Sequence, residues 1–217
     1  MATAQRGRRA AEMTDNDLSP ETAGQDDWAW VIEHPTVFDD DGRMSFIHGI
    51  TPDDVFAAYG VPPAAVREMT LLESWGYDTS ADAETACVRV ALSGEWVVVM
   101  EPVRAGSLPT EPLGRAAVNH DFVTVTCNEM GPNQVSCHSP DGRSAVFLLN
   151  QPYYSLAGPS REYFDRLMHE VGLLPVPTPY STREEVVLAL AMMSREFGFT
   201  LSPETVRGPL PTALLPG

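Results

Sequence analysis

The sequence contains no lysine, only three cysteines and no long apolar run. Its 217 residues carry 14 basic side chains, all of them arginine, against 30 aspartates and glutamates, which gives a formal net charge of −16. A negative potential of this size repels phosphate backbones and anionic lipid, which argues against nucleic acid or a membrane as a partner. The same potential attracts cations, so the composition favours a protein partner of basic character.

The three cysteines, Cys87, Cys127 and Cys137, cannot all pair and show no framework spacing. We therefore expect reduced thiols in a cytoplasmic protein. The polar N-terminal stretch lacks the apolar core of a signal peptide, and no run of about 18 apolar residues is present that could span a membrane. A chain of this length buries roughly 70% of the surface that its unfolded form exposes, so it needs neither a metal nor a disulfide to fold.

The chain is expected to form a single domain, residues 28–208, between two flexible ends. Residues 1–27 are polar, charged and poor in large apolar side chains, so a disordered tail is predicted there. Residues 209–217 are expected to form a flexible Pro-rich tail. At the start of the domain, Trp28, Trp30 and Ile32 alternate as in a half-buried strand, but a first helical turn would also place Trp28 near Ile32. The sequence leaves both alternatives open.

Several elements can be placed in the first two thirds of the chain. A short helix is predicted between Thr51, which can cap it, and Gly60, which can end it, with Pro52 in its first turn. Alternating apolar residues predict strands before and after this helix, and short turns between them indicate an antiparallel meander. The expected strands are 44–50, 87–92, 96–100, 122–127, 134–139 and 145–149, with a loop from Pro102 to Gly114.

The last third of the chain changes to helical periodicity. Phe164, Leu167, Met168 and Val171 follow i, i+3, i+4, i+7 spacing, which predicts a helix that ends at Gly172. A capping-box spacing at 181 and 184 precedes a second amphipathic helix that ends at 198, and a last short turn begins at 202. Strands followed by helices predict an α+β domain, with an antiparallel meander, helices packed on one face, and two C-terminal amphipathic helices.

Taken together, the motifs resemble a family of uncharacterised bacterial proteins, a domain of unknown function common in actinobacterial genomes. The resemblance covers about residues 28 to 206 and rests on the order and spacing of the motifs. It implies no catalytic residue. The motifs are Phe46 to Val55, Gly94-Glu95-Trp96 running to Glu101-Pro102, Asp141-Gly142, Met168-His169-Glu170-Val171-Gly172 and Leu201-Ser202-Pro203-Glu204. This chain departs from the family pattern after Glu101-Pro102, where Val103 to Gly106 replaces a small Gly-containing turn.

Thiols and imidazoles suggest two kinds of chemistry, and the spacing argues against both. Cys127, Cys137 and His138 have ligand types that suit zinc, but there is no Cys-x-x-Cys or His-x-x-x-His pair. A cysteine nucleophile would need a histidine base, and adjacent strand residues such as Cys137 and His138 point to opposite faces. That leaves only His48, His120 or His169 as remote bases, so we read the cysteines as apolar filler.

Other recognised active-site patterns are also missing. Asp39-Asp40-Asp41-Gly42 clusters carboxylates as a calcium loop does, but position 48, where an EF-hand needs Glu, is His. The sequence holds no phosphate-binding glycine loop, no nucleophile elbow and no dinucleotide fingerprint. No cofactor, metal or catalytic residue is therefore predicted, and catalysis is not expected.

The remaining candidates are contact residues. Tyr153 and Tyr154 follow Pro152 in a loop-like segment, and large amphipathic rings anchor interfaces when they are exposed. With Glu101 and Arg104 they form the predicted interface set. The leading hypothesis is a non-catalytic cytoplasmic binding or accessory module with an acidic surface. The alternative is a small-molecule-binding enzyme with a dispersed site, in which Glu101, Arg89 and a histidine would converge.

Overall fold

The fold is built on one antiparallel sheet of eight strands in the part of the chain that the structure describes. The computed structural model describes residues 24–33, 42–78, 85–101, 111–127, 132–175 and 182–216. The strand order is β2-β8-β3-β4-β1-β5-β6-β7. The strands are β1 (Arg43–His48), β2 (Arg67–Met69), β3 (Thr85–Ser93), β4 (Trp96–Glu101), β5 (Phe122–Thr126), β6 (Gln134–His138), β7 (Ser144–Leu148) and β8 (Leu210–Pro216).

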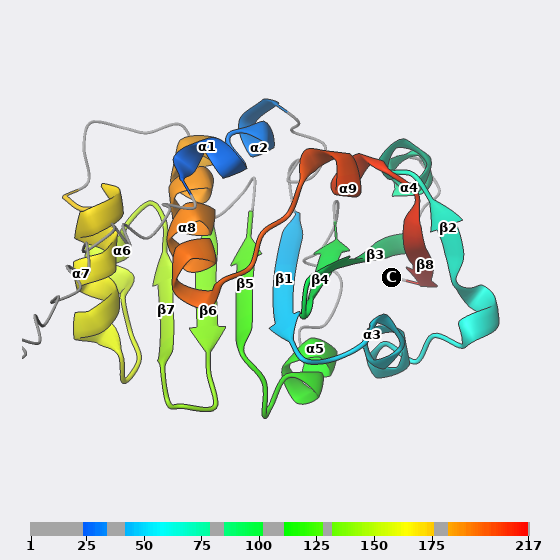
Figure 1. Ribbon diagram of the computed structural model, residues 1–217, viewed down its shortest axis with the longest axis horizontal. Helices are drawn as coiled ribbons and strands as arrows, with labels where there is room; N and C mark the ends of the chain where they lie inside the picture. The colour runs from blue at the N-terminus through cyan, green and yellow to red at the C-terminus, as the bar shows by residue number, and fades with distance from the viewer. Residues whose placement is uncertain are drawn as a thin grey trace, which may run out of the picture.

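Helices surround this sheet, so the predicted α+β class is confirmed (Figure 1). Among the described helices, none has the length and apolar character needed to cross a lipid bilayer. The helices are α1 (Gln25–Trp28), α2 (Trp30–Glu33), α3 (Pro52–Ala58), α4 (Leu71–Asp78), α5 (Glu111–Ala116), α6 (Pro152–Ser155), α7 (Arg161–Val171), α8 (Thr182–Phe197) and α9 (Pro203–Arg207), with a 3₁₀ turn at Pro63–Ala65.

The larger core lies on the face that is turned to the viewer in Figure 1, where α8 lies in front of the sheet. Residues 186–194 of α8 are buried on every side of the helix, because α8 contacts α1, α2, α7 and β5. At the centre of this core Phe46 and Phe199 stack with ring centroids 3.9 Å apart, and the edge of Trp28 meets both rings. Trp28 and Trp30 therefore belong to helical turns that close the core, which decides between the two alternatives for this segment.

A second core covers the opposite face at one end of the sheet. Val55 and Phe56 of α3 and Leu113 of α5 pack there against alternate residues of β3 and β4. The sequence analysis expected helices on one face only. The structure differs because every residue of β4 is buried, and a strand whose apolar residues run without alternation must be covered on both faces.

The C-terminal segment is part of the sheet, so the prediction of a flexible tail at residues 209–217 is wrong. β8 lies between β2 and β3, with Thr212 opposite Arg89 and Leu215 opposite Ala86. Its prolines suggested a tail, but Thr212, Ala213 and Leu215 of β8 are buried. The domain therefore continues beyond residue 208. At the other end, α1 begins at Gln25, inside the predicted tail, while residues 1–23 lie outside the described part of the chain.

The helix signals of α3, α7 and α9 are confirmed at the ends of these helices, while position 181 of the predicted capping box before α8 lies outside the described residues. Thr51 caps α3 in a reciprocal capping box with Asp54, with Pro52 at its start. Gly172 ends α7 in the left-handed conformation, and Ser202 caps α9. The predicted loop from Pro102 to Gly114 is helical from Glu111 onward, because Pro112 is tolerated in a first turn.

Both edges of the sheet are protected against strand addition. β2 is only three residues long. On the other edge, the outward backbone groups of β7 are occupied by the segment that follows α6. Val146 exchanges two hydrogen bonds with Ala157, the Ser144 carbonyl accepts from the Ser160 amide, and the Leu148 amide donates to the Ser155 hydroxyl. A partner therefore cannot bind by extending the sheet at β7.

This edge cover depends on Gly158. A Cβ built there would lie 2.5 Å from the Ser144 carbonyl oxygen, and the φ of Gly158 is +120°. We expect Gly158→Ala to lower the free energy of unfolding in urea by clearly more than the about 1–2 kcal/mol that a left-handed backbone costs a non-glycine residue. The matched control is Gly142→Ala, which has a φ of +95° and open space around the new methyl group. Equal losses for both variants would show that the close approach to β7 does not matter.

Candidate functional site

The second face of the sheet is open over β5, β6 and β7. In these strands buried residues alternate with partly exposed ones, and α5 borders the partly exposed side at β5 and β6. That side carries mainly polar groups, arranged in rows because the strands are in register. One row joins Ser45, Thr124 and Ser136 across β1, β5 and β6, and a neighbouring row joins Arg43, Thr126 and Gln134.

A cavity of about 310 Å³ lies where α5 borders this open face. Its floor comes from Arg43 and Ser45 of β1 together with the hydroxyls of β5 and β6. Leu113 and Phe122 supply apolar walls, and the exposed Glu111 stands at the rim. The helix α5 is held in place by its contacts with α3 and by burial of Leu113 in the second core.

A buried ion pair lies beneath the cavity and joins it to α3. Both Glu101 oxygens accept from Arg43: Oε2 from the guanidinium Nε, and Oε1 from Nη2 at 2.6 Å. The Tyr59 hydroxyl donates to Oε1 at 2.8 Å. The side chains of Arg43 and Glu101 are 5% and 0% exposed, so the pair is removed from water.

The pKa values of these groups follow from burial and from Glu101. Burial by itself would lower the pKa of the Arg43 guanidinium, but the hydrogen bond and the charge of Glu101 outweigh it and raise that pKa above its usual range. Burial, and then the negative charge of Glu101, raise the pKa of the Tyr59 phenol. Arg43 therefore stays charged and Tyr59 stays protonated, and the charges beneath the cavity cancel.

A second, more open cavity of about 450 Å³ lies between α3 and α5. Asp54, Arg115 and His120 line it with the backbone of Gly49. Hydrogen bonds from the amide and hydroxyl of Thr51 engage the Asp54 carboxylate and lower its pKa, so this carboxylate is occupied in capping α3. Arg115 is exposed. The polar side chains that line this cavity therefore do not interact with one another as Arg43, Glu101 and Tyr59 do.

The four predicted interface residues do not come together. Tyr153 and Tyr154 are 54% and 85% exposed on α6, beside β7. Glu101 is fully buried, which corrects its assignment to an interface: as the last residue of a strand covered on both faces, it can be stabilised only by an internal cation. Arg104 lies outside the described residues.

The alternative hypothesis, an enzyme, required Arg89 and Glu101 to meet in one site, and the structure keeps them apart. Arg89 stands opposite Met100 in the sheet, so its side chain lies on the other face from that of Glu101. The Arg89 guanidinium is fully buried and donates to the carbonyls of Met69, Val206 and Gly208 at 2.8–3.1 Å. Burial lowers its pKa to about 10. Arg89 thus ties β3 to the ends of β2 and α9.

The cysteine and histidine candidates are also separated. Cys137 lies in the larger core, whereas His138 is on the open face with its Nε2 atom 3.0 Å from the Ala117 carbonyl oxygen. This agrees with the expected opposite orientation of neighbouring strand residues. Among the described residues, no group of three or more His, Cys, Asp and Glu side chains could hold a metal ion.

Burial makes the thiols of Cys127 and Cys137 poor nucleophiles, because it raises the pKa of each to about 12. We expect iodoacetamide to modify both residues rapidly at pH 8 in urea and only slowly in the folded protein, with peptide mass spectrometry as the readout. Since the folded pKa values exceed the ordinary value of about 8.5, these thiols also contribute stability that is complete below pH 8.5 and is lost as the pH rises toward 12. Comparable modification of the folded and unfolded protein would contradict this account.

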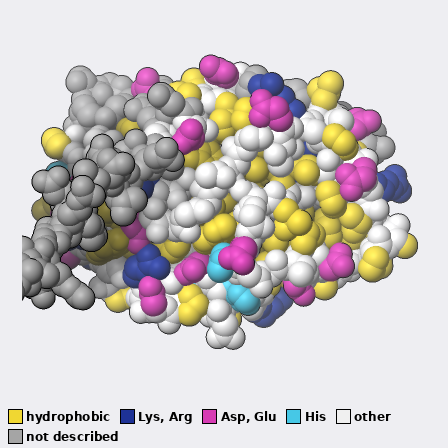
Figure 2. All heavy atoms as spheres, viewed as in Figure 1, with side chains coloured by type: hydrophobic (Ala, Val, Ile, Leu, Met, Phe, Trp, Pro, Cys, Tyr) yellow, Lys and Arg dark blue, Asp and Glu magenta, His cyan; other side chains and the backbone are white. Residues whose placement is uncertain are grey.

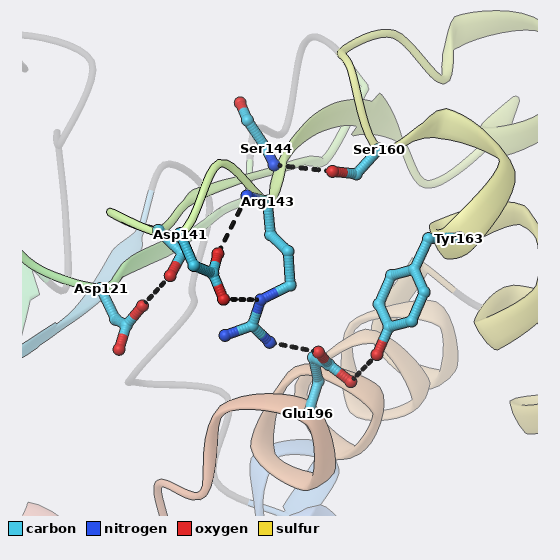
Figure 3. Close-up of polar contacts among 8 residues, drawn as sticks. Asp121, Asp141, Arg143, Ser144, Ser160, Tyr163 and Glu196 are labelled. Carbon is cyan, nitrogen blue, oxygen red and sulfur yellow. Dashed lines mark hydrogen bonds and ion pairs between the residues drawn. The ribbon is translucent and has the colours of Figure 1, made fainter.

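A further polar cluster, which sequence reasoning missed, fastens the helices to the turn between β6 and β7 (Figure 3). Arg143 donates from Nε to Asp141 at 2.8 Å and from Nη1 to Glu196 near the end of α8. Tyr163 of α7 donates to the other Glu196 oxygen, and the Arg143 guanidinium lies 5.1 Å from the centre of the Phe197 ring. The hydrogen-bonding groups and charges of these residues are paired with one another, so the cluster has a structural role.

The comparisons with known proteins supply no relative: no family model, no curated protein and no solved structure matches this chain. The candidate sites are therefore weighed by their geometry alone. The sequence could have indicated three of the groups that sequence reasoning missed. Each of these hydroxyl residues stands between two buried residues of a strand; they are Ser45, Thr124 and Ser136. Their convergence with Arg43 had no such signal, because it depends on strand order.

The charge pair beneath the cavity can be tested by a double-mutant cycle. Glu101→Leu leaves Arg43 buried without its counter-charge, and Arg43→Met does the same to Glu101, so we expect each to lower the free energy of unfolding by about 3–5 kcal/mol. The double variant removes both charges and should be less destabilised than either single variant. Urea unfolding monitored by tryptophan fluorescence measures all three. Additive losses in the double variant would show that the two side chains are not coupled.

Proposed function

We propose that the protein is a non-catalytic accessory module that binds a protein partner, with Tyr153 and Tyr154 as part of the contact. The observation that carries the proposal is the exposure of both rings. They meet edge to face with centroids 5.4 Å apart, so each ring restricts the other. Paired exposed aromatic rings offer a large contact area at low entropic cost, as binding anchors do.

The segment that carries the two rings is anchored to the sheet and the core. The Ser155 hydroxyl accepts from the Leu148 amide of β7 at 2.7 Å, which holds the end of α6 against the sheet. Pro152 is buried at the start of α6, and Leu156 at its end is buried in the larger core. The tyrosines are therefore presented by a fixed segment, and their loss should remove contact area without loosening the core.

Charge supports a partner of basic character. The chain has 30 acidic against 14 basic residues, and Asp and Glu side chains are scattered over the face seen in Figure 2. Exposed charge of one sign accelerates association with a partner of the other sign. Salt weakens this effect, because it screens the interaction between charges that are more than about 8 Å apart at physiological ionic strength.

We also propose that the protein is a member of the actinobacterial family of unknown function and that it is located in the cytoplasm. The proposed membership rests on the order and spacing of the motifs, which fall at the ends of elements: Thr51-Pro52 begins α3, Glu101 ends β4 and Gly172 ends α7. Buried thiols at Cys127 and Cys137 support a reducing compartment. The alternative of a dispersed enzyme site gains no support, since Arg89 and Glu101 lie on opposite faces of the sheet.

The proposal is tested with the double variant Tyr153→Ala/Tyr154→Ala. A partner is first captured by cross-linking at low salt in the cells of origin, identified by mass spectrometry, and then produced separately. We expect the double variant to bind this partner at least about tenfold more weakly, since two aromatic anchors are lost, and to unfold at nearly the wild-type temperature. Association of the wild-type protein should slow as salt rises.

The matched control is Leu72→Ala, which removes an apolar side chain that is 75% exposed on α4. This variant should bind as the wild type does. Equal affinity of the tyrosine double variant and the control would disprove the contact, and so would unfolding of the double variant, because the rings would then belong to the core.

A further inference from the structure

We infer that the cavity between α5 and the open sheet face binds a neutral, polyhydroxylated small molecule of monosaccharide size. This inference goes beyond the proposed protein contact, which lies on α6 and shares no residue with the cavity. It rests on three features of the cavity: a row of hydroxyl groups, cancelled charge and apolar walls.

The hydroxyl row supplies matched hydrogen-bonding groups. Ser45, Thr124 and Ser136 stand directly opposite one another on β1, β5 and β6, and neighbouring side chains in such a row are about 5 Å apart. Ser45 donates to Thr124 at 3.0 Å, which leaves the Thr124 and Ser136 hydroxyl hydrogens to donate to a ligand. Each hydroxyl both donates and accepts, so a ligand that itself carries several hydroxyls is the best complement.

The charges of the floor select a neutral ligand. Among the described residues that line the cavity, Arg43 is the cation, and its charge is balanced by Glu101 in a buried pair. The Nε and Nη2 atoms of the Arg43 guanidinium already donate to Glu101, so a phosphate or carboxylate group would meet a cation whose charge is balanced. A charged group without a counter-ion also loses its hydration on entry. At the rim, Glu111 adds a negative charge that further disfavours anions.

The walls fit the apolar surface of a sugar ring. Leu113 of α5 is buried, and Phe122 of β5 is partly exposed; both line the cavity. The partly exposed aromatic ring of Phe122 can cover the C–H face of a ligand while the ligand's hydroxyls meet the polar row. A volume of about 310 Å³ is at the lower end for ligand sites, which suits a single sugar unit and not an oligomer.

The test uses the full-length protein and saturation-transfer NMR, with glucose, galactose, mannose and N-acetylglucosamine as neutral probes and glucose 6-phosphate as the charged probe. We expect at least one neutral sugar to bind with a millimolar or lower dissociation constant, and the phosphorylated sugar to bind more weakly. Absence of binding by every neutral probe at tens of millimolar, or tighter binding of the phosphorylated sugar, would overturn the inference.

Variants then locate the site. Ser136→Ala and Thr124→Val each remove one hydroxyl of the row, and each should weaken binding of the sugar about five- to tenfold, as the loss of one hydrogen bond does. The matched control is Ser144→Ala, which removes a hydroxyl from the same open face on β7 but outside the cavity. If Thr124→Val lowers the unfolding temperature, Ser136→Ala decides alone. Binding that survives Ser136→Ala, or that falls equally with Ser144→Ala, would place the sugar elsewhere.

The tyrosine double variant separates this inference from the proposed function. Tyr153→Ala/Tyr154→Ala should bind the sugar as the wild type does, because neither ring lines the cavity. Loss of sugar binding in that variant would contradict the assignment of the ligand to the cavity, whatever the outcome for the protein partner.

Discussion

Burial of β1 and β4 on both faces is the constraint on which the rest of the structure depends. These two strands lie side by side in the middle of the sheet, with the aromatic cluster of Phe46 and Phe199 on one face and α3 with α5 on the other. A polar group placed in them has no access to water and must be satisfied inside the protein. Arg43 at the start of β1 and Glu101 at the end of β4 are directly opposite in the register, and each neutralises the other.

The open face begins where the sheet is no longer covered on both of its faces. α3 and α5 cover β3, β4 and part of β1, and beyond Leu113 the sheet continues through β5, β6 and β7, whose alternate residues on that side are partly exposed. The border between covered and open sheet creates the cavity, and the buried ion pair lies beneath that border. Because of its position Arg43 has two roles: it balances the charge of Glu101 in the core and contributes to the floor of the cavity.

The surfaces available for recognition are limited by the same architecture. The outer edge of β7 is occupied by the segment around Ala157, and β2 at the other edge is short, so strand addition is disfavoured at both ends. Two of the places that stay accessible are the pair of tyrosines that α6 presents beside β7 and the hydroxyl-bearing cavity on the open face. These two places are separate and carry different chemistry, which is why they support separate proposals.

The sequence by itself determined the elements that depend on neighbouring residues. Thr51 with Asp54 delimits α3, the spacing of Phe164 to Val171 defines α7, and alternation defines the strands, because caps and periodicity act over a few residues. It also indicated that Cys137 and His138 point apart and that Tyr153 and Tyr154 are exposed. Only the tertiary structure decided that β8 enters the sheet, that Glu101 is buried against Arg43, and that the hydroxyls of Ser45, Thr124 and Ser136 form one row. These features join residues from distant parts of the chain, and they follow from strand order and burial, which local sequence does not encode.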